Sequence, residues 1–160
     1  MEKNFNQFGS TVSARNVAEI QLSYTPKVKA AHRPKITSSR DAYGIFRCSW
    51  DENLIDFVEQ FKVMLLNRAN KILGVLEIST GGISGTVADP KLIFAAALKA
   101  GASGMILSHN HPSSNLQPSD ADILLTKKVK AGGELLEISV LDHLIVTSEG
   151  YFSFADEGLL

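Results

Sequence analysis

The sequence predicts an α/β protein, in which a mixed β-sheet is flanked by helices in a single domain. Its length, 160 residues, suits one compact domain. Hydrophobic residues make up 44% and charged residues 21%, values typical of a soluble globular chain and not of a disordered, collagen-like or coiled-coil one. Apolar runs of strand length alternate with helical segments over most of the chain, which favours one sheet covered by helices.

The N-terminal part predicts a loose arm, a strand and a short helix. Residues 1–16 are mostly polar. In residues 17–24, VAEIQLSY, apolar and polar side chains alternate, which predicts a half-buried strand. It could pair with its own sheet or with a second chain, so the oligomeric state stays open. The connection TPKVKAAHRPK follows, and Ser38 or Ser39 could cap a helix over residues 40–47.

Two apolar runs follow. Residues 61–66 and 72–78 are separated by NRANK, which predicts a β-hairpin although its turn contains no glycine. The next segment, residues 79–85, is the glycine-rich STGGISG. It lacks the Gly-Lys-Ser/Thr ending of a phosphate-binding loop, so we expect a loop beside a cleft.

A helix and a buried strand come next. Asp89 is suited to cap the helix and Pro90 to occupy its first position. The helix should cover residues 91–100 and end at Gly101, because glycine readily adopts the left-handed backbone found after a helix. Residues 105–107 are apolar and predict a short buried strand, which ends in the polar segment SHNHPSSNLQPS.

The remaining residues predict one helix and two strands. Ser119 is suited to cap a helix that should stop at Gly132-Gly133. Residues 135–146 are rich in leucine and β-branched residues and predict a strand, and residues 151–154 predict a short one.

Charge is unevenly distributed along the chain. Residues 1–40 contain seven Lys and Arg and two acidic residues. Residues 41–160 contain nine Lys and Arg and fifteen acidic residues. We therefore divide the chain into a basic N-terminal segment, residues 1–50, and an acidic body, residues 51–160.

Cysteine content and hydropathy predict a cytoplasmic protein without membrane contact. The single cysteine, Cys48, cannot form an internal disulfide, so nothing requires an oxidising compartment. The N-terminal MEKNFNQFGS has no apolar stretch typical of a signal peptide. No apolar run approaches the ~20 residues of a membrane span.

The segment after the predicted strand of residues 105–107 carries a motif suited to metal binding. His109 and His111 are two positions apart, so both imidazoles should project from one face of an extended chain. Pro112 then turns the chain, and Ser119 and Asp122 complete the spacing His-x-His-x7-Ser-x-x-Asp. Two imidazoles and a carboxylate suit a catalytic zinc whose fourth position is left to water. Ser-x-x-Asp is also a helix-capping pattern, and the two roles are compatible.

This motif and its surroundings resemble a known metalloprotease family. SHNHPSSNLQPSDADILLT, residues 108–126, resembles the JAMM signature of Jab/MPN domains, and in particular of their bacterial RadC-like branch. EQFKVMLLNRANKIL, LDHLIV and YFSFADEGL resemble the opening hairpin and closing strands of that branch, so the resemblance runs from Glu59 to the C-terminus. It implies a JAMM/MPN-like, cytidine-deaminase-like fold for the body. At Ser114 the branch usually carries glycine.

The resemblance also implies a mechanism. It implies one zinc ion per chain, held by three ligands: His109, His111 and Asp122. Glu59 matches the glutamate that takes a proton from the metal-activated water, with Glu77 as its rival, and Ser119 matches the hydroxyl that stabilises the oxyanion. The implied reaction is hydrolysis of an amide bond, peptide or isopeptide, in a peptide or protein substrate.

Some residues near these motifs stay open or are set aside. Asp142 and His143 could support the metal site from behind, or could be satisfied by local hydrogen bonds in a strand. His32, within the basic connection, is not expected to be a ligand. Cys48 lies far from the histidines in sequence, so a cysteine nucleophile is not expected.

A nucleic-acid function is the main alternative. RadC-like proteins have traditionally been labelled DNA repair proteins, which implies a repair or recombination accessory or a metal-dependent nuclease. The acidic body has the wrong charge for phosphate contacts. Basic residues of the N-terminal segment favour the alternative: Lys27, Lys29, Arg33, Lys35 and Arg40. A binding module with a vestigial metal site is a third interpretation, disfavoured because every implied site residue is present.

Overall fold

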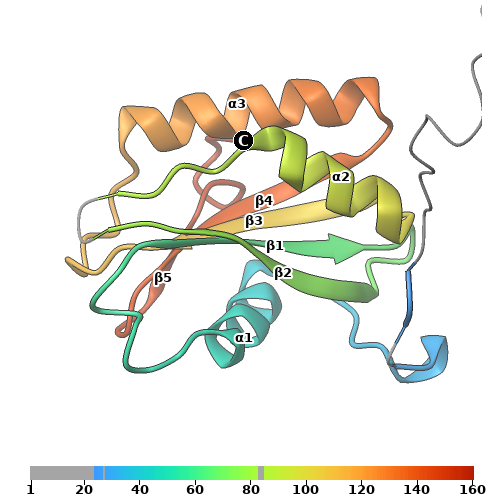
Figure 1. The fold of residues 1–160 in the computed structure, drawn as a ribbon, viewed down its shortest axis with the longest axis horizontal. Helices are drawn as coiled ribbons and strands as arrows, with labels where there is room; N and C mark the ends of the chain where they lie inside the picture. The colour runs from blue at the N-terminus through green and yellow to red at the C-terminus, as the bar shows by residue number, and fades with distance from the viewer. Residues whose placement is uncertain (1–23, 27, 83–84) are drawn as a thin grey trace, which may run out of the picture.

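The computed structural model describes residues 24–26, 28–82 and 85–160 (Figure 1). It confirms the α/β fold class. The strands are β1 (Gln60–Leu66), β2 (Ile72–Thr80), β3 (Gly104–Asn110), β4 (Ser139–Val146) and β5 (Tyr151–Ser153). The helices are the short 3-10 turn η2 (Ala30–His32) and the α-helices α1 (Ser39–Ser49), α2 (Pro90–Ala100) and α3 (Asp120–Leu135). Among the described residues, no helix has both the length and the apolar character that crossing a membrane requires.

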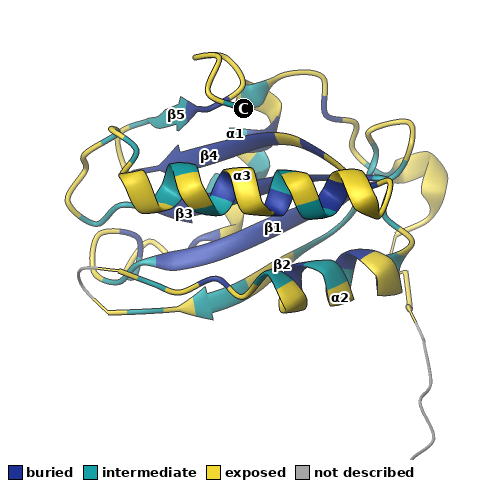
Figure 2. Cartoon of the chain, turned by 90° about the horizontal axis from the view of Figure 1, so that it is seen from above, coloured by how far each residue is buried: buried dark blue, intermediate teal, exposed yellow. Residues whose placement is uncertain are grey.

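The five strands form one mixed sheet in the order β2-β1-β3-β4-β5. Strand β1 is antiparallel to both β2 and β3, β3 is parallel to β4, and β4 is antiparallel to β5. Helices α2 and α3 cover one face and α1 covers the other (Figure 1). The central strands β1, β3 and β4 are buried, whereas the edge strand β2 is more exposed (Figure 2).

Each face of the sheet has its own hydrophobic core. Phe61 and Leu107 lie in the core beneath α2 and α3, whereas Phe46 of α1 packs with Met64 and Leu144 on the opposite face. Successive side chains of a strand point to opposite faces, so both faces of β1 and β3 are covered. Helix α1 lies in the N-terminal segment, residues 1–50, but it shares a core with the strands of the body.

The predicted hairpin and the predicted short helix before it are confirmed. Ser38 caps α1: its side chain accepts a hydrogen bond from the backbone N–H of Asp41, whose carboxylate accepts from the N–H of Ser38 in return. In the hairpin turn, which lacks glycine, Asn70 adopts φ 56. Asparagine tolerates this left-handed backbone better than most residues, so it does the work of a turn glycine.

Helix α2 is also confirmed with its boundaries. The Asp89 side chain accepts a hydrogen bond from the backbone N–H of Lys91, Pro90 occupies the first turn, and Gly101 ends the helix with φ 63. Of the predicted strand over residues 17–24, only Tyr24 lies within the described residues. Its hydroxyl donates to the carbonyl of Leu73 on β2 at 2.6 Å.

Three predicted boundaries are wrong: the end of β3, the end of α3 and the start of β4. Strand β3 continues through Asn110, so His109 lies inside the strand and not in the loop after it. Helix α3 runs through Gly132-Gly133 to Leu135, and the next strand starts only at Ser139. The glycines serve close packing: a Cβ at Gly132 would lie 2.8 Å from the ring of Phe94, and one at Gly133 would lie 2.3 Å from the carbonyl oxygen of Ile138.

Gly133→Ala should lower the free energy of unfolding by about 1–3 kcal/mol. Alanine favours a helix over glycine by about 1 kcal/mol, but here the new methyl group would collide with a backbone carbonyl, which a side-chain rotation cannot move away. Gly44→Ala in α1 is the matched control, because Gly44 is exposed and its added Cβ would meet no atom within 4 Å. It should raise stability by up to about 1 kcal/mol in urea unfolding. Equal responses would contradict the packing argument.

Candidate metal centre

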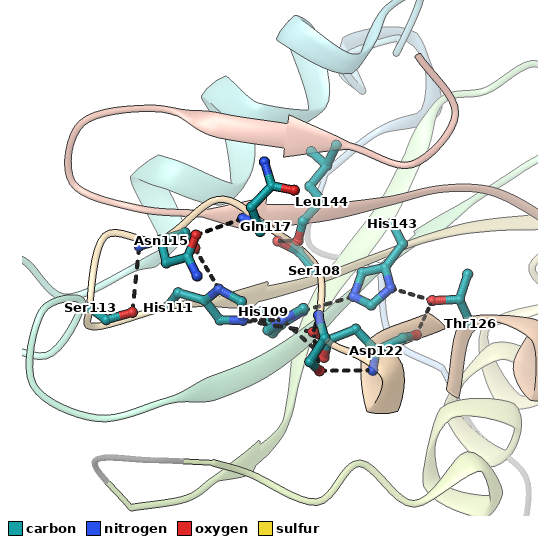
Figure 3. Close-up of polar contacts among 11 residues, drawn as sticks. Ser108, His109, His111, Ser113, Asn115, Gln117, Asp122, Thr126, His143 and Leu144 are labelled. Carbon is teal, nitrogen blue, oxygen red and sulfur yellow. Dashed lines mark hydrogen bonds and ion pairs between the residues drawn. The ribbon is translucent and has the colours of Figure 1, made fainter. Parts of the chain in front are cut away.

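The three predicted metal ligands meet where β3 ends and α3 begins (Figure 3). His109 is the second-last residue of β3, His111 follows the strand, and Asp122 lies in the first turn of α3. His109 is only 1% exposed, whereas His111 and Asp122 are half-buried. One ligand atom from each residue lies within 4.8 Å of the others. The structure therefore brings together residues that the sequence separates by up to 13 positions.

The distances within this cluster match those between the ligands of one small cation. His109 Nε2 lies 3.0 Å from His111 Nε2 and 3.3 Å from Asp122 Oδ1, and His111 Nε2 lies 3.8 Å from Asp122 Oδ2. Two ligand atoms bound to one tetrahedral zinc lie roughly 3.3 Å apart, as follows from metal–ligand distances of about 2.0–2.1 Å. The side chains are therefore already close to a metal-binding arrangement.

The loop after β3 fixes the orientation of the His111 ring. His111 Nδ1 lies 2.6 Å from the carbonyl oxygen of Asn115, which can only accept, so Nδ1 carries the donated proton. A neutral His111 consequently presents the lone pair of Nε2 to the cluster. The loop reaches this geometry through Ser114 at φ 59. The resemblance in the sequence implies glycine at this position, and glycine adopts such a backbone without steric cost.

Asp122 is both a helix cap and a member of the cluster. Its Oδ2 accepts from the backbone N–H of Ser119 at 2.7 Å and from the Ser119 hydroxyl at 2.6 Å, and Oδ1 faces His109. Partial burial raises the pKa of the Asp122 carboxyl, but the contacts with His109 and Ser119 outweigh burial and hold it well below its usual value. The group is therefore a carboxylate at neutral pH, as a metal ligand must be.

The sequence left the roles of Asp142 and His143 open, and the structure separates them. His143 is fully buried and its Nε2 lies 2.9 Å from His109 Nδ1, directly behind the cluster. Asp142 points to the other side of β4, where its carboxylate accepts from the Ser153 hydroxyl at 2.7 Å and the backbone N–H of Ala155 at 2.9 Å. Asp142 therefore holds the turn after β5, and only His143 contacts a cluster residue.

Glu59 immediately precedes β1, and its backbone extends the pairing of β1 with β2. Its N–H donates to the carbonyl of Gly82 at 3.0 Å, and its own carbonyl accepts from the N–H of Gly81 at 2.8 Å. Phe61, two residues later, is paired with His109 across the sheet. Because alternate residues of an extended chain share a face, Glu59 lies on the same face as His109.

Glu77, the rival for the role of general base, lies on the opposite face. Its carboxylate accepts from Gln60 Nε2 at 3.0 Å and lies 3.9 Å from Lys62 Nζ. Lys62 in turn donates to the carbonyl of Ser49 at the end of α1. The sheet therefore stands between the side chains of Glu77 and His109.

Asn110 is a site residue that the sequence analysis missed. Its Oδ1 accepts from the backbone N–H of Gln60 at 2.7 Å and from Trp50 Nε1 at 3.3 Å. Its Nδ2 donates to the carbonyls of Ile55 at 2.6 Å and Val58 at 2.8 Å. Asn110 thus ties the segment that carries Glu59 to the end of β3. Its position inside the His-Asn-His motif is the only sequence signal that could have indicated it.

Comparisons with known proteins identify the family of this chain. A family model described as "RadC-like JAB domain" matches residues 36–159. The chain belongs to this family. The match begins 23 residues before Glu59, where the resemblance in the sequence starts, and so includes α1. The RadC-like assignment predicted from the metal motif is confirmed.

Its relatives are longer proteins. A "UPF0758 protein" of Flavobacterium johnsoniae is 42% identical over 156 residues, which cover 97% of this chain and 67% of the relative. A "UPF0758 protein" of Porphyromonas gingivalis is 41% identical over 160 residues, 98% of this chain and 69% of the relative. One from Chlorobaculum parvum is 42% identical over 102 residues, 64% of this chain and 46% of the relative.

Asn110→Asp should destabilise the protein by about 3–5 kcal/mol, because it places a buried carboxylate oxygen against the carbonyls of Ile55 and Val58 in place of two N–H donors. Asn67→Asp is the matched control. Asn67 uses only its side-chain oxygen, which accepts from the backbone N–H groups of Ala69 and Lys71, so this change should cost less than about 0.5 kcal/mol. Urea unfolding at neutral pH measures both. Similar losses in the two variants would mean that Asn110 does not hold the segment.

Proposed function

We propose that this protein is a zinc-dependent hydrolase that cleaves amide bonds, peptide or isopeptide, in a peptide or protein substrate. The proposal rests on one observation above all: two imidazole nitrogens and a carboxylate oxygen converge within 4.8 Å at the end of a buried strand. Membership of the RadC-like JAB domain family supports it. So does the position of Glu59, which lies on the same face of the sheet, one strand away.

His109, His111 and Asp122 would hold the zinc ion. When bound in such a site, zinc polarises a carbonyl group and lowers the pKa of a water molecule. Glu59 would accept the proton of that water and deliver it to the leaving amine, as a general base and then a general acid. Among the described residues Glu59 forms no ion pair, and a half-buried carboxylate of this kind suits both steps.

Ser119 would donate a hydrogen bond to the oxyanion that develops on the substrate carbonyl. Its hydroxyl now donates to Asp122 Oδ2 at 2.6 Å, but the Ser119 backbone N–H donates to the same oxygen at 2.7 Å. The hydroxyl can therefore turn to the substrate while the N–H keeps the carboxylate in place. Ser119 is exposed at the start of α3, where a substrate can reach it.

The DNA-associated alternative stays a prediction. It depends on the basic N-terminal segment, and of the seven Lys and Arg in residues 1–40, Lys3, Arg15 and Lys27 lie outside the described residues. Neither the cluster nor the position of Glu59 requires a nucleic acid. Hydrolysis of an amide bond therefore remains the function that the geometry supports best.

The purified protein should bind about one zinc ion per chain, and zinc should raise its melting temperature, because a ligand that binds only the folded state stabilises it. His111→Ala removes one ligand from a half-buried position and should abolish both effects. His32→Ala in η2 is the control, since His32 lies outside the cluster and should change neither. Elemental analysis and thermal unfolding give the two readouts. A His111→Ala variant that retains zinc would contradict the proposed site.

Glu59→Gln should keep the zinc but lower turnover of peptide and isopeptide substrates by about 100-fold or more, because an amide cannot accept the proton. Glu77→Gln is the control with the same chemical change on the opposite face of the sheet, and its turnover should stay near that of the wild type. A library of peptides and ubiquitin-like conjugates supplies the substrates. If Glu77→Gln loses activity while Glu59→Gln keeps it, the assignment of the base is wrong.

A further inference from the structure

A chain of three hydrogen bonds runs from His109 back into α3 (Figure 3). His109 Nδ1 lies 2.9 Å from His143 Nε2, and His143 Nδ1 lies 2.6 Å from Thr126 Oγ1. Thr126 Oγ1 in turn lies 2.6 Å from the backbone carbonyl oxygen of Asp122. His143 and Thr126 are both buried, at 0% and 2% exposure, so water does not compete for these bonds.

The carbonyl at the end of the chain sets the direction of every bond. A carbonyl oxygen only accepts, so Thr126 donates its single hydroxyl proton to Asp122. Towards His143, the Thr126 oxygen can then only accept, so the proton of His143 lies on Nδ1. A neutral His143 has no second proton, and its Nε2 accepts from His109. The proton of His109 therefore lies on Nδ1.

The contacts of His143 are those of an uncharged ring, because among the described residues no carboxylate accepts from either of its nitrogens. Its ring stacks on Phe154 and meets the edge of Phe61, with centroid separations of 4.7 Å and 5.6 Å. An imidazolium at this position would need an acceptor at each ring nitrogen. The Thr126 oxygen accepts at Nδ1, but the neighbour of Nε2 is a ring nitrogen of His109.

We propose that His143 and Thr126 are positioning residues that hold the proton of His109 on Nδ1 and thereby keep Nε2 free for a metal ion. Histidine in water favours the opposite tautomer, in which Nε2 is protonated and cannot bind a metal. We call the chain of hydrogen bonds from the Asp122 carbonyl through Thr126 and His143 to His109 the relay. It reverses the preference of the free side chain inside the fold. Its consequence for zinc rests on the proposed function, but the position of the proton is a property of the metal-free protein.

Thr126→Val tests the relay at a residue that contacts no ligand side chain. Valine has nearly the shape of threonine but no hydroxyl, so His143 Nδ1 would lose its acceptor. The proton of His143 would move to Nε2 and point at His109 Nδ1, and His109 would carry its own proton on Nε2. We expect a loss of zinc affinity of about 10–100-fold. Thr126→Ser keeps the hydroxyl and should restore the wild-type behaviour.

The experiment has two readouts on the full chain. Nitrogen-15 NMR of the histidine rings, on zinc-free protein at a pH at which the imidazoles are neutral, locates the proton of His109. Competition with a chelator measures zinc affinity. We expect Nδ1 protonation in the wild type and in Thr126→Ser, and Nε2 protonation with weakened zinc binding in Thr126→Val. A wild type protonated at Nε2, or a valine variant with unchanged proton position and affinity, would overturn the proposal.

The two readouts also separate this proposal from the proposed function. Nδ1 protonation that requires the Thr126 hydroxyl, in a chain that binds no zinc, would support the relay and contradict the zinc enzyme. Zinc-dependent hydrolysis with equal affinity in Thr126→Val and Thr126→Ser would support the enzyme and contradict the relay.

Discussion

The end of β3 is buried on both faces, and most of the site follows from that constraint. Ser108, His109 and Asn110 are at most 1% exposed, so each polar side chain needs a partner within the protein. The Ser108 hydroxyl donates to the carbonyl of Leu144 on β4, and His109 contacts His143, which is also on β4. Asn110 binds the segment before β1. Three consecutive residues therefore bind β4, orient a candidate metal ligand and hold the segment that carries the proposed base, Glu59.

The alternation of side chains along β3 gives neighbouring residues different tasks. His109 points to the face covered by α2 and α3, where Asp122 and Thr126 lie, and Asn110 points to the face covered by α1. The segment that Asn110 holds ends at Glu59. Phe61 pairs with His109 across the sheet, and Glu59, two residues before Phe61, lies on the same face as His109. A change at either residue should therefore disturb the other, although their side chains never touch.

Local signals in the sequence predicted much of this protein, because caps, turns and strand alternation act within a few residues. The caps at Ser38, Asp89 and Ser119 all appear in the structure, as does the His-His-Asp convergence. The predicted end of α3 was wrong because Gly133 does not terminate the helix. Its lack of a side chain allows close packing against the carbonyl of Ile138. Such contacts, like the role of His143, depend on how β3 and β4 pair, which no short stretch of sequence determines.

Burial varies across the cluster in a way that limits how a substrate could approach. His109, His143 and Thr126 are buried, His111, Asp122 and Glu59 are half-buried, and Ser119 is exposed. Among the described residues, the accessible side of the site is therefore the one formed by His111, Asp122, Glu59 and Ser119, and a substrate would approach from there. On the closed side, an apolar environment strengthens the hydrogen bonds that orient His109. For the proposed hydrolysis this division is required, because the ligands have to stay fixed while the proton-transfer and oxyanion groups meet a substrate.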